Sequence, residues 1–128
     1  MRDLNGDVDS GTFIVGHQDG VTVLALIGEH DMSTADQLSA TISEHAELGR
    51  GVVIVLTEAD FVDSGIIREL FAGDQLMIAH GRRLVIQSDP ASTLEKVLAL
   101  SGVRAQFLCS DTVDEAVRLA GRRYRDQD

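Results

Sequence analysis

The sequence predicts a single α/β domain with a mostly parallel sheet. Apolar, β-branched runs that suit strands alternate with segments whose apolar residues recur at helical spacing. Glycines end several of these segments, and 128 residues suffice for one packed core but not for two. Strands that alternate with helices are typical of parallel sheets with right-handed crossovers. We expect the domain to span 12–121, between a polar tail at 1–11 and a charged tail at 122–128.

Five strands are predicted, at 12–15, 21–27, 52–56, 84–86 and 103–109. Asp19-Gly20 predicts a tight turn that joins the first two strands into an N-terminal hairpin, because Gly accepts positive φ freely. The third run is apolar throughout, which is typical of a central strand. Four helices are expected between and after the later strands, so the predicted order is ββαβαβαβα.

Capping residues and glycines predict where these helices begin and end. The expected N-terminal caps are Thr34 (in a capping box with Gln37), Asp89 (followed by Pro90), and either Ser110 or Asp111. The second helix is expected from Ser64 to about His80. Gly49, Gly81 and Gly102 are expected to end the first three helices.

Asp74 interrupts the apolar face of the expected helix over 64–80. It falls in the middle of an arc of apolar residues, where an unpaired buried carboxylate would cost several kcal/mol. Three interpretations are open. The helix bends so that Asp74 reaches solvent, Arg82 or Arg83 pairs with it, or this face is a partner-binding patch.

Composition argues against several classes of function. A net charge of −10 repels phosphate backbones and anionic lipid, and scarce aromatic residues do not suit base stacking. We therefore expect no direct nucleic-acid or membrane partner, but a partner with a basic docking face. The chain lacks glycine-rich nucleotide motifs, a nucleophile elbow and metal-ligand spacing, so we expect no enzyme activity, cofactor or metal.

The single cysteine, Cys109, excludes an internal disulfide and fits a reducing compartment. It lies in an apolar run, which predicts a buried core thiol. The acidic N-terminus is no signal peptide, and no run is long enough to span a membrane. These features predict a cytoplasmic protein.

Ser64 follows the central strand at the mouth of a helix, where open α/β sheets gather functional groups. A phosphate added there would meet free helix N–H groups, and it would lie among acidic residues that include Asp60 and Asp63. The added charge would penalise a partner that docks on this edge. The alternative is that Ser64 only caps the helix.

The second notable segment is Gly-Glu-His-Asp at 28–31, which ends the second strand. The alternative reading is a polar turn with a capping Asp. Both segments leave the same edge of the sheet, so we expect four carboxylates to cluster near Ser64: Glu29, Asp31, Asp60 and Asp63.

Together these segments resemble the STAS domain, named for sulfate transporters and anti-sigma-factor antagonists, and specifically its free-standing bacterial antagonists. The matching segments are 28–31 with Thr34-Ala35, Phe-Val-Asp-Ser at 61–64, Gly81, Ser-Asp-Pro at 88–90, and Leu-Ser-Gly-Val at 100–103. The resemblance covers about 12–120, and it implies a non-catalytic STAS-type domain that takes part in partner switching during transcription regulation and stress response.

In that family the unphosphorylated antagonist binds an anti-sigma factor that is also a serine kinase, and thereby releases the sigma factor. Phosphorylation disables the antagonist, and a serine phosphatase restores it. By the match, Ser64 is the phosphoacceptor. The expected partner-binding residues are Asp63, Gly65, Asp60, Glu29 and Asp31.

One departure concerns the residues after Ser64. The family usually has Asp-Ser-Ser/Thr-Gly, whereas Gly65 and Ile66 follow Ser64 here. An ungapped match keeps the helix length and leaves Ser64 as the acceptor. A one-residue deletion would instead put Ser64 at the second hydroxyl position and remove the acceptor.

Two rival functions remain open. The chain could be a non-catalytic STAS scaffold or accessory subunit of a stress-sensing assembly or a lipid transporter. It could also be a small hydrolase that uses Ser64, Asp63 and one histidine, although no motif supports this.

Overall fold

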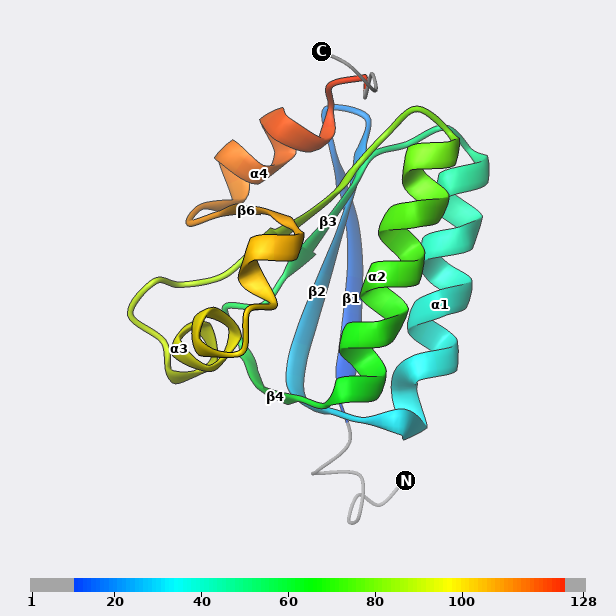
Figure 1. The fold of residues 1–128 in the computed structure, drawn as a ribbon. Coiled ribbons are helices and arrows are strands. Elements are labelled where there is room, and N and C mark those ends of the chain that lie inside the picture. The colour runs from blue at the N-terminus through cyan, green and yellow to red at the C-terminus, as the bar shows by residue number, and fades with distance from the viewer. Residues whose placement is uncertain (1–10, 124–128) are drawn as a thin grey trace.

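The computed structural model describes residues 11–123 and has two helical layers on a central sheet (Figure 1). Its strands are β1 (Thr12–Gln18), β2 (Val21–His30), β3 (Val52–Val55), β4 (Ala59–Val62), β5 (Leu84–Gln87) and β6 (Leu108–Ser110). Its helices are α1 (Met32–Glu47), α2 (Ser64–Ala79), α3 (Thr93–Leu100), the 3₁₀ turn η2 (Arg104–Gln106) and α4 (Val113–Ala120). The two expected tails lie almost wholly outside the described residues. No helix among those described is long and apolar enough to cross a membrane.

The sheet is mostly parallel, as predicted. Its order is β1-β2-β3-β5-β6, and only the β1–β2 hairpin is antiparallel. Alternate side chains of β3 face opposite layers: Ile54 packs in the core under α1, α2 and α3, whereas Val53 packs under α4. This alternation follows from the pleat of a strand covered on both faces. The predicted α/β class is confirmed.

The prediction missed β4 and overextended the last strand. β4 is four residues long and pairs in parallel with the far end of β2, so its pairing depends on a strand about thirty residues away in the chain. The segment predicted as a strand over 103–109 instead forms η2 and then β6, which begins only at Leu108. Short, mixed segments of this kind carry little periodicity.

All predicted helices exist, but the expected caps were wrong. The side chains that accept N–H groups at the four helix starts belong to Asp31, Asp63, Ser92 and Thr112. Asp89 instead accepts the Ala91 N–H in a turn that precedes α3, so Pro90 does not open a helix. Several residues near each start have side chains that could act as the cap. The path of the backbone into the helix selects one of them. Gly49, Gly81 and Gly102 follow the first three helices with φ of 76°, 77° and 80°, as predicted.

Asp74 is buried, and its pairing with Arg83 is one of the three predicted interpretations. Arg83 donates from Nε and Nη2 to the two carboxylate oxygens at 3.0 Å each, and the Leu84 N–H donates to Oδ1. Arg82 instead donates to the carbonyls of Gly49 and Gly121. Burial of Asp74 contradicts the interpretation in which a bend exposes it.

Cys109 is half-buried rather than fully buried. Its Sγ lies 3.6 Å from the carbonyl oxygens of Arg104 and Phe107, and burial raises the pKa of the thiol. The raised pKa keeps this side chain protonated and disfavours the thiolate, the reactive form of cysteine.

Candidate functional site

The two segments singled out by the sequence lie side by side at one edge of the sheet. β2 continues past an irregularity at Gly28, so that Glu29 is in register with Phe61 of β4, and His30 with Val62. The Asp63 N–H then donates to the His30 carbonyl at 3.0 Å. This pairing brings the starts of α1 and α2 to the same end of the molecule (Figure 1).

Ser64 is exposed and forms the first residue of α2. Capping of this helix falls to Asp63, whose Oδ1 accepts the Ile66 N–H at 3.0 Å, so the interpretation of Ser64 as the cap is wrong. Within residues 11–123 the Ser64 hydroxyl has no hydrogen-bond partner. The hydroxyl is therefore open to an incoming group, with the first turn of α2 behind it.

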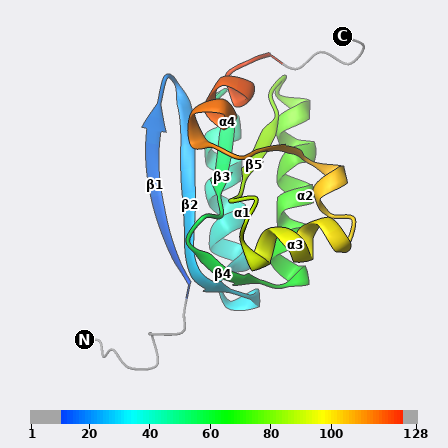
Figure 2. The same cartoon turned by 90° about the vertical axis from the view of Figure 1, so that its left-hand side faces the viewer.

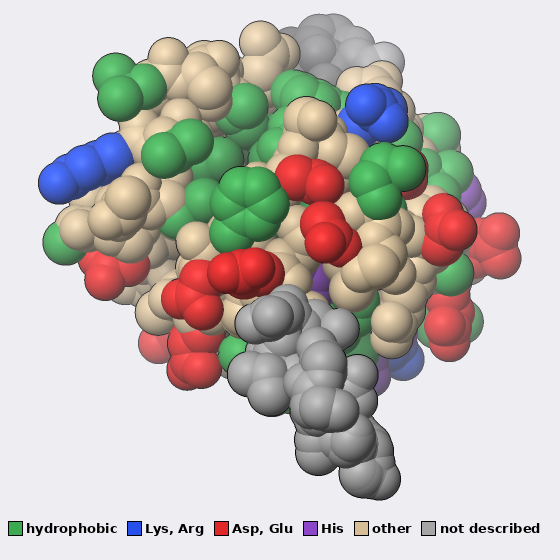
Figure 3. Space-filling model, turned by 90° about the horizontal axis from the view of Figure 1, so that it is seen from below, with side chains coloured by type: hydrophobic (Ala, Val, Ile, Leu, Met, Phe, Trp, Pro, Cys, Tyr) green, Lys and Arg blue, Asp and Glu red, His purple; other side chains and the backbone are tan. Residues whose placement is uncertain are grey.

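Three of the predicted carboxylates, Glu29, Asp31 and Asp60, are exposed around this edge, and Asp63 is half-buried. Figure 3 shows acidic side chains gathered on this end of the molecule, interleaved with apolar ones. Hydrogen bonds from the Ser33 hydroxyl and N–H lower the pKa of Asp31, so it is charged at neutral pH. The structure thus brings the predicted carboxylates to one edge.

Gly65, also predicted to contact a partner, is buried. A Cβ built there would lie 3.1 Å from Sδ of Met32 and 3.2 Å from Oδ1 of Asp63. Met32 is 68% exposed and Phe61 is 49% exposed. The sequence analysis did not single out Met32, because its place beside Gly65 depends on how the two helix starts meet.

His30 lies behind this edge and is fully buried. Its Nε2–H donates to the Ile27 carbonyl at 3.2 Å, and its Nδ1 lies 3.1 Å from the Thr34 hydroxyl. Burial lowers its pKa, and its ring packs against Phe13 at 4.7 Å between centroids. The ring nitrogens of His30 thus contact Ile27 and Thr34 rather than Ser64. Within the described residues no histidine is hydrogen-bonded to Ser64, as a hydrolase with a serine nucleophile would require.

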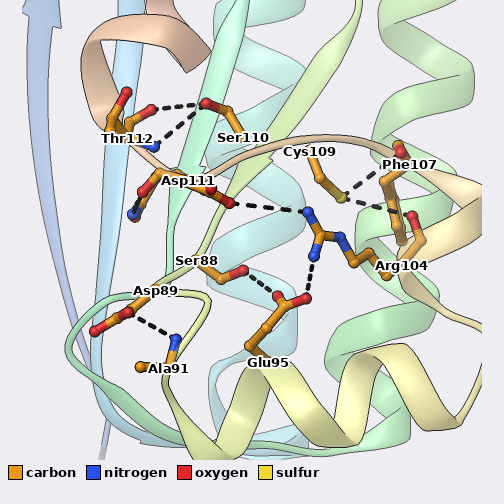
Figure 4. A network of polar contacts seen from close by, with 11 residues as sticks. Ser88, Asp89, Ala91, Glu95, Arg104, Phe107, Cys109, Ser110, Asp111 and Thr112 are labelled. Atoms are coloured by element: carbon orange, nitrogen blue, oxygen red, sulfur yellow. Dashed lines mark hydrogen bonds and ion pairs between the residues drawn. The ribbon is translucent and has the colours of Figure 1, made fainter.

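A polar network holds α3 near the same edge (Figure 4). The buried Glu95 carboxylate accepts a hydrogen bond from the Ser88 hydroxyl and pairs with Arg104. Arg104 also lies 3.9 Å from Asp111, so one guanidinium connects α3, η2 and the end of β6. Sequence reasoning missed this network because its members lie in separate elements, and no local pattern shows which of several polar residues will meet.

The edge therefore offers an exposed hydroxyl, several carboxylates and a few exposed apolar side chains. Among the described residues no group of three His, Cys, Asp or Glu side chains could hold a metal ion. Such an arrangement can accept a phosphoryl group and present a charged docking face.

Residues 12–116 match the model of the STAS domain family. Among solved structures, an anti-sigma factor antagonist from Mycobacterium paratuberculosis is 27% identical, with a TM-score of 0.73 over 88% of this chain and 95% of that one. The Bacillus cell fate determinant SpoIIAA in its phosphorylated form is 23% identical, with a TM-score of 0.63 over 84% and 97%.

An anti-sigma-factor antagonist (STAS) domain protein from Planctomyces limnophilus is 20% identical, with a TM-score of 0.67 over 86% of this chain and 98% of that one. The last two similarities show the shared fold alone. No curated protein matches the chain in sequence.

Proposed function

The chain belongs to the STAS domain family, and from that premise we propose that it is an anti-sigma-factor antagonist switched by phosphorylation of Ser64. Its unphosphorylated form binds an anti-sigma factor that is also a serine kinase, and this binding releases the sigma factor. Phosphorylation ends the binding, and a serine phosphatase restores it. The chain acts in the cytoplasm as a substrate and ligand rather than as an enzyme, and ATP belongs to the partner.

The exposed Ser64 side chain carries this proposal. Asp63 caps α2, which leaves the Ser64 hydroxyl without a structural role at the helix start. The similarity to an anti-sigma factor antagonist at 27% identity supports the same reading. Loss of the hydroxyl should therefore leave the fold intact, as a switch residue requires.

Phosphorylation would add roughly −1.5 to −2 charges to this edge at neutral pH. The added charge would lie near Asp63 and the exposed carboxylates of Glu29, Asp31 and Asp60. A partner that docks here must then desolvate or neutralise more negative charge, and the phosphate also adds bulk to the start of α2. Both effects weaken a complex that formed on the unmodified edge.

The first experiment uses the full chain to capture its kinase from cells of its source, followed by mass spectrometry and an ATP-dependent phosphorylation assay. We expect one phosphate, on Ser64. Ser64→Ala should abolish the modification but retain binding, and Ser64→Asp should weaken binding. Ser101→Ala is the control, since Ser101 is also exposed and its hydroxyl donates to the Leu98 carbonyl rather than to a carboxylate of the Ser64 edge.

Reproducible phosphate on Ser33, Ser88 or Ser101 instead of Ser64 would contradict the assignment. A captured partner that binds equally well before and after Ser64 modification would favour the scaffold reading. Ser64 without any phosphate, although the kinase is active on another substrate, would favour the reading in which the acceptor has been lost.

A second experiment tests the docking role of Asp63. Asp63→Asn retains a side-chain oxygen for the Ile66 N–H and removes only the charge. Association with the captured partner should slow, and the difference should shrink as salt is added. Glu44→Gln, an exposed carboxylate near the other end of α1, is the control and should change little. Rates indifferent to both charge and salt would show that the acidic edge does not steer the partner.

A further inference from the structure

β1 is an open edge of the sheet. It lies at one end of the strand order and pairs only with β2 among the described elements, in an uninterrupted register of seven residues. Figure 2 shows β1 at the margin of the molecule, with the helices on the far side of β2. The opposite edge is β6, which is three residues long and offers little to an incoming strand.

β1 also lacks the features that protect exposed edges. Its sequence, TFIVGHQ, has no Lys, Arg, Asp, Glu or Pro, and its pairing with β2 has no bulge. Ile14 and Val15 are 55% and 47% exposed, and as neighbours in a strand they lie on opposite faces of the sheet. The outward-pointing N–H and C=O groups of β1 can therefore pair with another strand, and Ile14 and Val15 can add apolar contacts on the two faces of the sheet.

A second copy of this chain fits this edge for an electrostatic reason. The chain carries a net charge of −10, so two copies repel wherever their acidic surfaces meet. Residues 12–28 are the exception, because Asp19 at the turn is the only charged residue among them. An antiparallel strand edge is also complementary to itself about a two-fold axis.

We propose that two copies associate through antiparallel pairing of β1 with β1, centred on Val15 opposite Val15. This register uses every residue of the strand, since its remaining pairs are Thr12 with Gln18, Phe13 with His17, and Ile14 with Gly16. β1 starts at the Ser64 end of the molecule, so antiparallel pairing points the two Ser64 ends in opposite directions and leaves both open. The proposal goes beyond the proposed function and does not depend on it.

Charge complementarity supports this orientation. Nη1 of Arg50 lies 3.3 Å from Nε2 of His17, near the end of β1. The proposed register places that end of one copy beside the start of β1 in the other, which adjoins Ile27 and, two residues later, the exposed Glu29. A cation of one copy thus approaches the acidic end of its partner, and the two acidic ends stay apart.

Analytical ultracentrifugation of the full chain across low to high micromolar concentrations tests the association. We expect a concentration-dependent dimer for the natural sequence and a monomer for Val15→Lys, because the two lysines would face each other directly. Leu100→Lys on α3 is the control: this residue is 89% exposed and far from β1 in the chain, so the variant should still dimerise. A natural chain that stays monomeric throughout, or a dimer unaffected by Val15→Lys, would overturn the proposal.

Cysteine cross-linking tests the register with milder changes, in a Cys109→Ser background. Val15→Cys should form a disulfide-linked dimer under mild oxidation, since opposed residues in an antiparallel pair lie within disulfide reach. Gln18→Cys is the matched control on the same strand. Its expected partner is Thr12, so the two cysteines would be roughly 20 Å apart and should not link. No link at position 15, or equal links at both positions, would exclude this register.

Discussion

The aspartates at the start of α2 and toward its end have opposite environments. At the start of the helix Asp63 caps the first turn and lies beside the exposed Asp31 and Asp60. Near its end Asp74 is 4% exposed and receives three hydrogen bonds, two from Arg83 and one from the Leu84 N–H. One end keeps its negative charge at the surface, and the other neutralises it inside the fold.

The difference separates residues that serve stability from residues that are free to serve binding. A buried carboxylate without a partner would be costly, so the fold supplies Asp74 with a guanidinium and a backbone N–H. Carboxylates in water need no such support and can be replaced at little cost to the fold. We therefore expect substitutions at the two ends to differ sharply in their effect on unfolding.

Asp74→Ala should have the largest effect. It leaves the charge of Arg83 without this carboxylate and the buried Leu84 N–H without its acceptor, so stability should fall by about 3–5 kcal/mol. Urea unfolding followed by circular dichroism would measure the change. Asp60→Ala, at the exposed end, is the control and should stay within about 0.5 kcal/mol. Equal losses for both variants would remove the contrast between the two ends.

Two glycines sharpen the same comparison. A Cβ at Gly51, just before β3 and at the end of the molecule opposite Ser64, would lie 2.0 Å from the Ala120 carbonyl oxygen. Gly51→Ala should therefore cost about 3 kcal/mol. At Gly65 the nearest atom is the flexible, exposed Met32 Sδ at 3.1 Å, so Gly65→Ala should change stability by less than about 1 kcal/mol. Thermal melts of the two variants would contradict the contrast if Gly65→Ala proved the more damaging.

Asp63 should show an intermediate effect, because it contributes to the fold only as a cap. Asp63→Ala removes the acceptor of the Ile66 N–H and should cost about 1 kcal/mol. Asp63→Asn retains an acceptor and should cost only about a few tenths of a kcal/mol. The same urea titrations would measure both losses of stability. If both substitutions cost the same, the charge of Asp63 rather than its hydrogen bond would stabilise the helix start.

The smallest expected effect is a pH dependence of stability, which comes from one buried histidine near each end of α1. Burial lowers the pKa of His30, at the Ser64 edge, and of His45, which is hydrogen-bonded to Thr22. The folded state thus favours neutral imidazole. Stability should be full above the ordinary histidine pKa of 6.5 and should fall as the pH drops below it.

Urea midpoints from about pH 7.5 to about pH 5.5 would measure this loss, in a range above the titration of the carboxylates. His30→Gln and His45→Gln should each flatten the profile, whereas His80→Gln, an exposed residue at the end of α2, serves as the control. A natural chain that becomes more stable on acidification over this range would contradict the assignment.

Features that depend on neighbours in the chain could be predicted from the sequence. Periodicity identified the four α-helices of the described residues, and the positive φ of the glycines after α1, α2 and α3 matched the predicted helix ends. The same periodicity marked Asp74 as anomalous, because a carboxylate on an apolar face stands out without any structure. The position of Ser64 at the edge of the sheet was likewise predictable, since a polar segment that follows a buried central strand and leads into a helix lies at that edge.

Tertiary structure alone decided the rest, because it depends on how separate elements pair and pack rather than on a local pattern. β4 exists only because β2 extends beyond Gly28 to pair with it. The fold directs Arg83 rather than Arg82 to Asp74, and it brings Ser88 and Arg104 to Glu95. It also gave the capping of α2 to Asp63, which leaves Ser64 exposed. Local sequence offers several polar residues with nearly equal propensity at such places, and packing and strand pairing select among them.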